Sequence, residues 1–167
     1  MDMLIVARKL HELSFGKLMD VYTEGNQESG LMHWPEESEG RRLALAEQEF
    51  YQYLHQVFFR TPRSCYLIWE ERGSYVSALR LEPYQDGLLV EALETAPVHR
   101  RKGYAAQLVT AALEMAGDTR IYAHVDKKNI ASLRTHEKCG FHRILDHAIY
   151  ADGSVDAVCC TLCHTAK

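Results

Sequence analysis

The sequence has no long apolar segment and no excess of basic residues. No apolar run approaches the ~18 residues of a membrane-spanning helix. Its 19 lysines and arginines are outnumbered by 23 aspartates and glutamates, for a formal net charge of −4. Nucleic-acid-binding domains commonly show the opposite balance. We therefore expect a protein that neither spans a membrane nor binds nucleic acid.

The N-terminus lacks the features of a secretory signal. Asp2 stands where such a signal has a basic residue, and the following apolar stretch is shorter than the ~7–15 residues of a signal core. Residues 1–8 are predicted to form a first strand instead. The five cysteines, an odd number without an export signal, favour reduced thiols over disulfides. A cytoplasmic protein is expected.

Cys160, Cys163 and His164 match the C-x-x-C-H pattern of haem attachment. Haem attachment normally follows export, and the second cysteine lies four residues from the C-terminus. A final strand over residues 155–162, with small thiols packed against a sheet, is the preferred interpretation. No metal site is expected. A haem- or metal-binding protein is the alternative, which absorbance spectra and metal analysis would test.

The chain also shows no internal repeat and no linker. Its 167 residues, 47% hydrophobic and 25% charged, suit one globular domain with a substantial core. In the first half, apolar residues recur every three or four positions in two segments, and β-rich runs separated by turn signals follow. The predicted elements are helices 9–22 and 43–61, a polar segment 23–39 between them, and an antiparallel meander of strands 65–70, 75–84 and 88–95.

The second half alternates helix and strand. An apolar stripe at helical spacing stops at Gly117, and a shorter helical segment closes at Gly140. The predicted elements are helix 105–116, strand 120–125, helix 129–139, and a hairpin of strands 144–150 and 155–162. The order β-α-α-β-β-β-α-β-α-β-β predicts a single α/β (α+β) domain in which helices flank a mixed central sheet.

The segment from Arg100 to Ala105 joins a predicted strand to the strongest helix. A helix N-terminus presents unpaired backbone N–H groups and a partial positive charge, which together suit a phosphate. Gly103 and Ala105 keep side-chain bulk away from those amides, while Arg100, Arg101 and Lys102 add positive charge. The alternative is an exposed basic helix start with a chance glycine.

Two segments resemble the GNAT superfamily of N-acetyltransferases. Arg100-x-x-Gly103-x-Ala105 is similar to the family's (Gln/Arg)-x-x-Gly-x-(Gly/Ala) acetyl-CoA motif. Asn129-x-x-Ser132, followed by Glu137-Lys-Cys-Gly-Phe, is similar to its Asn-x-x-(Ala/Ser)…Tyr-Glu-Lys-x-Gly-Phe segment. The order of elements agrees with that fold. The resemblance implies an acetyl-CoA-dependent N-acetyltransferase, with a CoA-binding regulatory module of weak or no activity as the alternative.

The resemblance also implies roles for individual residues. The backbone of Leu93 and Thr95 would hold the acetyl carbonyl and the pantetheine arm, where amides fixed before reaction polarise the thioester. Asn129 and Ser132 would line the far side of that arm. The pyrophosphate would be cradled by Arg101, Lys102, Gly103, Tyr104 and Ala105, with Arg100 opening the motif.

The sequence departs from the family at His136, which replaces a tyrosine commonly assigned as the general acid toward the CoA thiolate. His136 is therefore a candidate acid, with packing on the short helix as the alternative. An alkylamine has a pKa of about 10.4 and must lose a proton before it attacks. Glu91 and Glu94 are candidate bases, and strand alternation places them on opposite faces. His99 and His124 are weaker candidates.

The polar segment 23–39 contains five glutamates and no lysine or arginine. Acidic residues beside an acceptor groove would attract a cationic amine, while the alternative is a solvated acidic loop. His33, Trp34 and Pro35 would add an apolar wall. We expect a small-molecule or peptide amine as acceptor, and a homodimer is compatible with the sequence.

Overall fold

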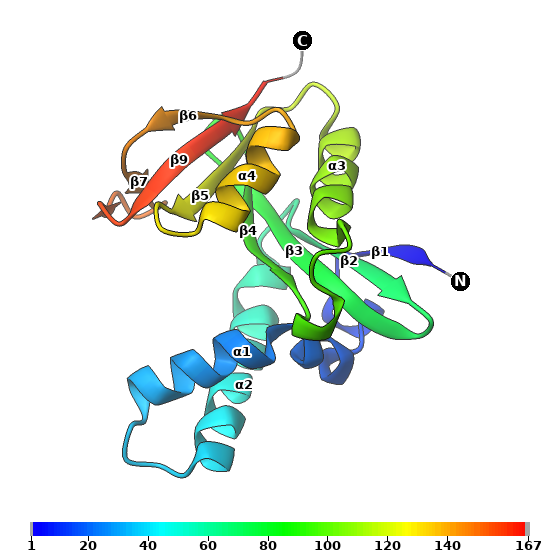
Figure 1. The fold of residues 1–167 in the computed structure, drawn as a ribbon, viewed down its shortest axis with the longest axis vertical. Coiled ribbons are helices and arrows are strands. Elements are labelled where there is room, and N and C mark those ends of the chain that lie inside the picture. Colours follow the sequence, from blue (N-terminus) through cyan, green and yellow to red (C-terminus); the bar gives the residue numbers. More distant parts are fainter. Residues whose placement is uncertain (1, 166–167) are drawn as a thin grey trace.

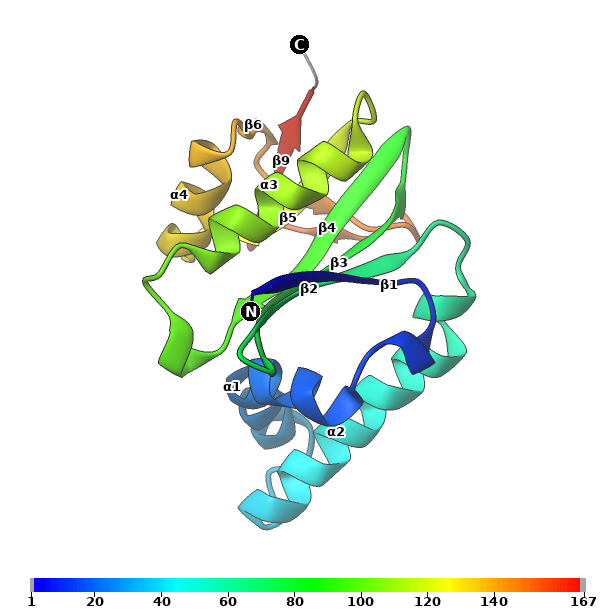
Figure 2. The same cartoon turned by 90° about the vertical axis from the view of Figure 1, so that its right-hand side faces the viewer.

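A seven-stranded mixed sheet runs through the molecule in the order β1-β2-β3-β4-β5-β9-β6, with helices on both faces (Figures 1 and 2). The computed structural model describes residues 2–165, so Met1 of the predicted first strand lies outside the described residues. The strands are β1 Met3–Ala7, β2 Cys65–Glu71, β3 Ser74–Tyr84, β4 Gly87–Thr95, β5 Ile121–Asp126, β6 His142–Leu145, β7 Ala148–Ile149, β8 Val155–Asp156 and β9 Cys159–His164. The helices are α1 Phe15–His33, α2 Glu39–Gln56, α3 Tyr104–Ala116 and α4 Ile130–Lys138, with short 3-10 turns η1 Leu10–Glu12, η2 Phe58–Arg60 and η3 Pro97–His99.

Side-chain alternation along the strands creates a core on each face of the sheet. Leu67 in β2 packs with Leu108 and Val109 of α3 on one face. Its neighbour Tyr66 packs with Leu18 of α1 on the other face. In Figure 2, α3 lies on one side of the sheet and α1 and α2 on the other. The predicted α/β domain with a mixed sheet is confirmed.

The first helix is longer than the periodicity predicts. It begins after Ser14, whose hydroxyl accepts a hydrogen bond from the Lys17 amide at 3.4 Å, and it continues through most of the supposed polar segment to His33. Asn26 and Gly30 are buried in this stretch, and a Cβ on Gly30 would stand 2.9 Å from the Arg42 carbonyl oxygen of α2. The predicted end of this helix at residue 22 was wrong. Apolar periodicity stops there, but the helix continues because it contacts α2 through a small residue, Gly30, and not through apolar side chains.

The predicted C-terminal hairpin is present, but each of its arms is divided into two strands. β7 and β8 pair at the tip, and β6 and β9 pair antiparallel in the main sheet, where β9 lies between β5 and β6. Cys160 and Cys163 in β9 face opposite sides and belong to separate cores. Within residues 2–165, no group of three or more His, Cys, Asp or Glu side chains is arranged to hold a metal ion. None of the helices in that range has the length and apolarity needed to cross a membrane.

Candidate active site

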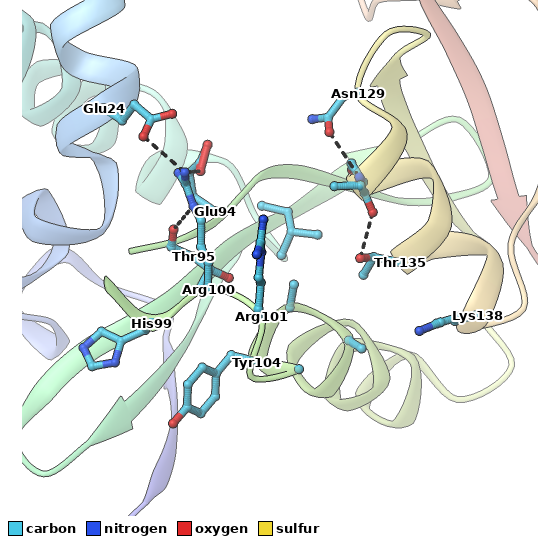
Figure 3. Close-up of a pocket in the computed structure, with 16 residues that line it drawn as sticks. Glu24, Glu94, Thr95, His99, Arg100, Arg101, Tyr104, Asn129, Thr135 and Lys138 are labelled. Atoms are coloured by element: carbon cyan, nitrogen blue, oxygen red, sulfur yellow. Dashed lines mark hydrogen bonds and ion pairs between the residues drawn. The ribbon is translucent and has the colours of Figure 1, made fainter. Parts of the chain in front are cut away.

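A cavity of about 680 Å³ lies where the C-terminal end of β4 meets the start of α3 and one side of α4 (Figure 3). Its size is within the ~300–1,000 Å³ of small-molecule sites. The lining also includes Glu24 from α1 and Glu94 from β4. The cavity is therefore bordered by elements from both faces of the sheet.

The cavity opens where β4 and β5 separate. The two strands pair in parallel only from Leu88 to Val90 of β4, although β4 continues to Thr95. A β-bulge lies just beyond the last pair, because Ala92 and Leu93 stand opposite the single residue Leu79 of β3. Ala92 has a φ of 50°, in the left-handed region that is uncommon for alanine. The bulge thus removes β4 from regular pairing at the cavity.

The start of α3 supplies unpaired amides to the same cavity. Gly103 caps the helix with a φ of 84°, and the first turn closes with Gln107 N–H donating to the Gly103 carbonyl at 3.1 Å. The amides of Tyr104, Ala105 and Ala106 precede that bond and have no partner four residues back. Glycine satisfies the left-handed cap without a steric penalty. This arrangement suits an anionic group.

Comparison with known families identifies the chain. Residues 28–141, more than half of its length, match the sequence profile of the Acetyltransferase (GNAT) family. The chain belongs to this family. Comparison with curated proteins finds no matching sequence.

Solved structures of N-acetyltransferases have the same fold. The PaiA N-acetyltransferase of Thermoplasma acidophilum in complex with coenzyme A is 12% identical with a TM-score of 0.66, covering 98% of this chain and 99% of that one. An N-acetyltransferase of Staphylococcus aureus Mu50 is 17% identical with a TM-score of 0.63, covering 100% and 99%. A chimera of the spermidine N-acetyltransferase SpeG from Vibrio cholerae and hSSAT is 19% identical with a TM-score of 0.62, covering 98% and 95%.

The structure brings most of the predicted site residues of this GNAT protein together. Lys102, Glu91 and His136 are not in the cavity lining. The predicted residues that do line it are Leu93, Glu94, Thr95, Arg100, Arg101, Gly103, Tyr104, Ala105, Asn129 and Ser132.

Sequence reasoning missed several lining residues of α4. Ala131, Thr135 and Lys138 line the cavity beside Ser132. Their spacing of three and four residues from one another is a helical-face signal that identifies them once one member of the face is known. Asn129 caps this helix by accepting a hydrogen bond from the Ser132 amide at 3.1 Å.

Arg100 and Arg101 point in different directions in spite of being neighbours. Arg100 contacts Glu24 at 3.2 Å and Glu94 at 3.8 Å and donates to the Thr95 carbonyl at 3.2 Å, whereas the side chain of Arg101 stands between Arg100 and α4 (Figure 3). Within residues 2–165, Arg101 makes no ion pair. Arg101 therefore has a cationic group available in the cavity, and that of Arg100 is already paired with carboxylates.

Glu91 and Glu94 lie on the same face of the sheet, contrary to the prediction from strand alternation. Glu91 pairs with Arg80 and Glu94 with Ala78, and those two β3 residues share the face covered by α1 and α2. The extra residue of the bulge shifts the alternation by one position. Only Glu94 lines the cavity, but both carboxylates face the side opposite α3.

The surroundings of both carboxyl groups favour the protonated form. Burial, together with the neighbouring carboxyl group of Glu82, raises the pKa of Glu91 to about 7, although the Arg80 guanidinium acts in the other direction. Burial also raises the pKa of Glu94, and the Arg100 guanidinium opposes this effect. A carboxyl group with a pKa near neutrality is matched to general base work at physiological pH.

His136 is buried, with 2% of its surface exposed, and it packs against Phe141. Its Nδ1 lies 2.8 Å from the Ser132 carbonyl oxygen, which can only accept, so Nδ1 carries a hydrogen. Burial lowers the pKa of His136, and Nε2 is buried without a hydrogen-bond partner among the described residues. Its neighbour Thr135 lines the cavity, whereas His136 does not.

The acidic segment contributes less to the cavity than expected. Of its five glutamates, Glu24 alone lines the cavity, and the other four are exposed. Glu36, Glu37 and Glu39 lie at the joint between α1 and α2, which projects away from the sheet in Figure 1. The supposed apolar wall at His33 and Trp34 lies at the same remote end.

Proposed function

We propose that the chain transfers the acetyl group of acetyl-CoA to a primary amine of a small molecule or peptide, by direct attack in a ternary complex. The observation that carries the proposal is the convergence of the bulged end of β4, the amide-bearing start of α3 and one face of α4 on a single cavity. Family membership supports acetyl transfer, and the neighbouring structure that contains coenzyme A supports the co-substrate.

The residues present fit a bound CoA molecule. The pyrophosphate would lie against the amides of Tyr104, Ala105 and Ala106, where a Cβ on the capping Gly103 would meet no atom within 4 Å. Arg101 would supply positive charge, with the exposed Lys102 near the outer phosphates. Asn129 and Ser132 would line the pantetheine arm opposite the backbone of Leu93 and Thr95.

Glu91 is the proposed general base. A primary amine arrives as an ammonium and must lose a proton before its nitrogen forms a bond to the thioester carbon. Glu91 faces the side of β4 opposite α3, and its pKa of about 7 lets it accept a proton near neutral pH. Glu94 lines the cavity and burial raises its pKa as well, but the Arg100 guanidinium at 3.8 Å opposes that rise. The tetrahedral intermediate then collapses, which breaks the carbon–sulfur bond and releases the CoA thiolate, and the remaining extra proton on the new amide nitrogen passes to this thiolate or to solvent.

His136 is not favoured as the acid that protonates this thiolate. A lowered pKa keeps the imidazole neutral near pH 7, and a neutral ring with its hydrogen on Nδ1 has none to give from Nε2. The thiolate of a thiol with a pKa of about 8.5 is a good leaving group without an acid. We propose that His136 packs α4 against Phe141.

A cationic acceptor is proposed because Glu24 and Glu94 both line the cavity and both contact the Arg100 guanidinium, at 3.2 and 3.8 Å. The carboxylates of Glu24 and of Glu28, one turn further along α1, also raise the pKa of Glu94. Such a group of carboxylates favours an approaching ammonium. One similar structure is named as a spermidine N-acetyltransferase, so polyamines belong in a first panel.

The test combines binding with turnover. CoA should raise the melting temperature, because a ligand that binds only the folded state stabilises it, and dephospho-CoA should do so less. Free thiol release from acetyl-CoA should then be measured with spermidine, an aminoglycoside and a peptide with a free N-terminus. Binding without turnover on a broad panel would favour the regulatory CoA-binding module, and the absence of any shift at millimolar CoA would refute both readings.

A further inference from the structure

Two buried tyrosine hydroxyls reach the bulge of β4 from the face opposite α3. Tyr22 of α1 donates a hydrogen bond to the Ala92 carbonyl oxygen at 2.6 Å. Tyr66 of β2 donates to the Tyr22 hydroxyl at 2.7 Å. The two side chains are 5% and 0% exposed, so water does not replace these bonds easily. The chain of hydroxyls therefore ends on the one residue of β4 with a positive φ.

The direction of that carbonyl determines the direction of the next amide. Residues 2–165 contain no cis peptide bond, and in a trans peptide the C=O and the following N–H point in opposite directions. Because the Ala92 carbonyl points toward Tyr22 and α1, the Leu93 N–H points away from α1. Leu93 lines the cavity and packs with the core under α3.

Ala92 does not hold this conformation by itself. A left-handed conformation at a residue with a Cβ costs roughly 1–2 kcal/mol and persists only where the surroundings impose it. The bulge also takes the Ala92–Leu93 peptide out of the regular β3–β4 ladder. A side-chain partner is therefore needed for its carbonyl, and Tyr22 supplies one.

We propose that Tyr22 is a positioning residue that, supported by Tyr66, holds the Ala92–Leu93 peptide so that the Leu93 amide donates to the acetyl carbonyl of the bound thioester. The inference rests on the proposed function, in which that amide polarises the carbonyl. Burial raises the pKa of Tyr22 well above its usual value, so the hydroxyl stays a donor throughout the working pH range.

The test compares the affinities of acetyl-CoA and CoA, which differ in the acetyl group. Tyr22→Phe removes one oxygen and keeps the ring. We expect the preference for acetyl-CoA over CoA to fall about fivefold, the typical worth of one hydrogen bond, while CoA affinity itself is unchanged. Tyr66→Phe should reduce the preference less, because Tyr22 keeps its bond to Ala92.

Tyr75→Phe is the matched control. Tyr75 is also 5% exposed in the same core, but its hydroxyl accepts a hydrogen bond from the Ser14 amide at 3.0 Å, away from β4. It should lose a similar amount of stability and keep the wild-type preference for acetyl-CoA. An unchanged preference in Tyr22→Phe, or an equal loss in Tyr75→Phe, would overturn the inference.

A second readout separates this inference from the proposed function. Backbone chemical shifts of Ala92 report its φ without any ligand. They should leave the positive-φ range in Tyr22→Phe and stay within it in Tyr75→Phe. If the wild-type protein bound neither CoA nor acetyl-CoA, the proposed function would fail, and these shifts would still decide whether Tyr22 holds the bulge. Unchanged shifts in Tyr22→Phe would show that the Tyr22 hydrogen bond does not hold Ala92 in its positive-φ conformation, and would overturn the inference.

Discussion

The face of β4 under α3 and α4 differs from the face under α1 and α2 in the groups that approach the strand. On the first, backbone amides at the start of α3 and small side chains such as Ala105 border the cavity. On the second, charged and hydroxyl side chains approach the strand, such as Glu24 and Tyr22 from the distant helix α1 and Arg80 from the adjacent strand β3. A cofactor that is the same in every family member suits a backbone site, whereas an acceptor that varies suits side chains.

The difference between the faces is also electrostatic. The Arg80 guanidinium lies 4.9 Å from the centre of the Tyr53 ring, with Glu82 and Glu91 nearby. Charge on this face acts on the protonation state of Glu91. Charge on the other face, at Arg101, is expected to act on the binding of the CoA phosphates. Substitutions should therefore divide into those that change the pH profile and those that change CoA affinity.

The largest effect on activity is expected from a substitution on the face of β4 under α1 and α2, where the acceptor is proposed to bind. Glu91→Gln should lower the maximal rate by about 10²–10⁴-fold, the usual contribution of a general base, with CoA affinity unchanged. In the wild type, kcat/KM should rise with pH through about 7, because the base works only when deprotonated. Initial rates measured from pH 5.5 to 9 check both statements.

Glu82→Gln is the control for that pH dependence. The Glu82 carboxyl group raises the pKa of Glu91, so its replacement should move the acidic limb to lower pH while the maximal rate is kept. An acidic limb that stays in place in Glu82→Gln, or full activity in Glu91→Gln, would assign the base elsewhere, with Glu94 next to be tested.

The second largest effect is expected on CoA affinity, from a substitution on the face under α3 and α4. Gly103→Val should weaken CoA binding by at least about 100-fold while the fold is retained, since a β-branched residue is an outlier at a φ of 84° and the amides would turn away from the phosphates. Calorimetric titration with CoA measures this. Gly117→Val is the matched control, because Gly117 has a φ of 57° at the opposite end of α3 and its added Cβ would also meet nothing within 4 Å. Equal losses of affinity in the two variants would place the phosphates elsewhere.

Arg100 and Arg101 allow a closer comparison, because the two side chains are neighbours with different partners. Arg101→Ala should weaken CoA by about 10-fold, the worth of a charge-assisted contact, and more at low salt than at high salt. Arg100→Ala should change CoA affinity much less, because its partners are Glu24 and Glu94. It should instead raise the pKa of Glu94, since the guanidinium now lowers it. Titrations with CoA at two salt concentrations compare the variants, and the reverse order of affinities would contradict the assignment.

The smallest effect on catalysis is expected at His136. His136→Ala should destabilise the fold by about 2 kcal/mol, because it removes a buried ring, yet the maximal rate should change within about twofold and the pH profile should be kept. Denaturant unfolding measures the loss of stability, and rates at saturating acetyl-CoA measure the change in maximal rate. A 10–100-fold loss of rate with a shifted basic limb would restore His136 as the acid.

Sequence reasoning was most successful where function depends on local backbone. The Arg100–Ala105 segment and the Asn129–Ser132 segment were each singled out from residues within a few positions of one another, and the structure brings most of these residues to one cavity. Helix α3 was also predicted to within one residue, because its apolar stripe and Gly117 are both local signals.

The remaining features depend on partners distant in the chain. The orientation of Arg100 depends on Glu24, 76 residues away, and the bulge at Ala92 is held by Tyr22, 70 residues away. The bulge places Glu91 and Glu94 on one face, and no strand-alternation rule can anticipate an inserted residue. The sequence alone determined the family, the fold class and the glycine-led start of α3, because these rest on local sequence signals. The tertiary structure decided which charged side chains lie at the cavity and how their pKa values shift, because side-chain direction and pKa depend on long-range packing.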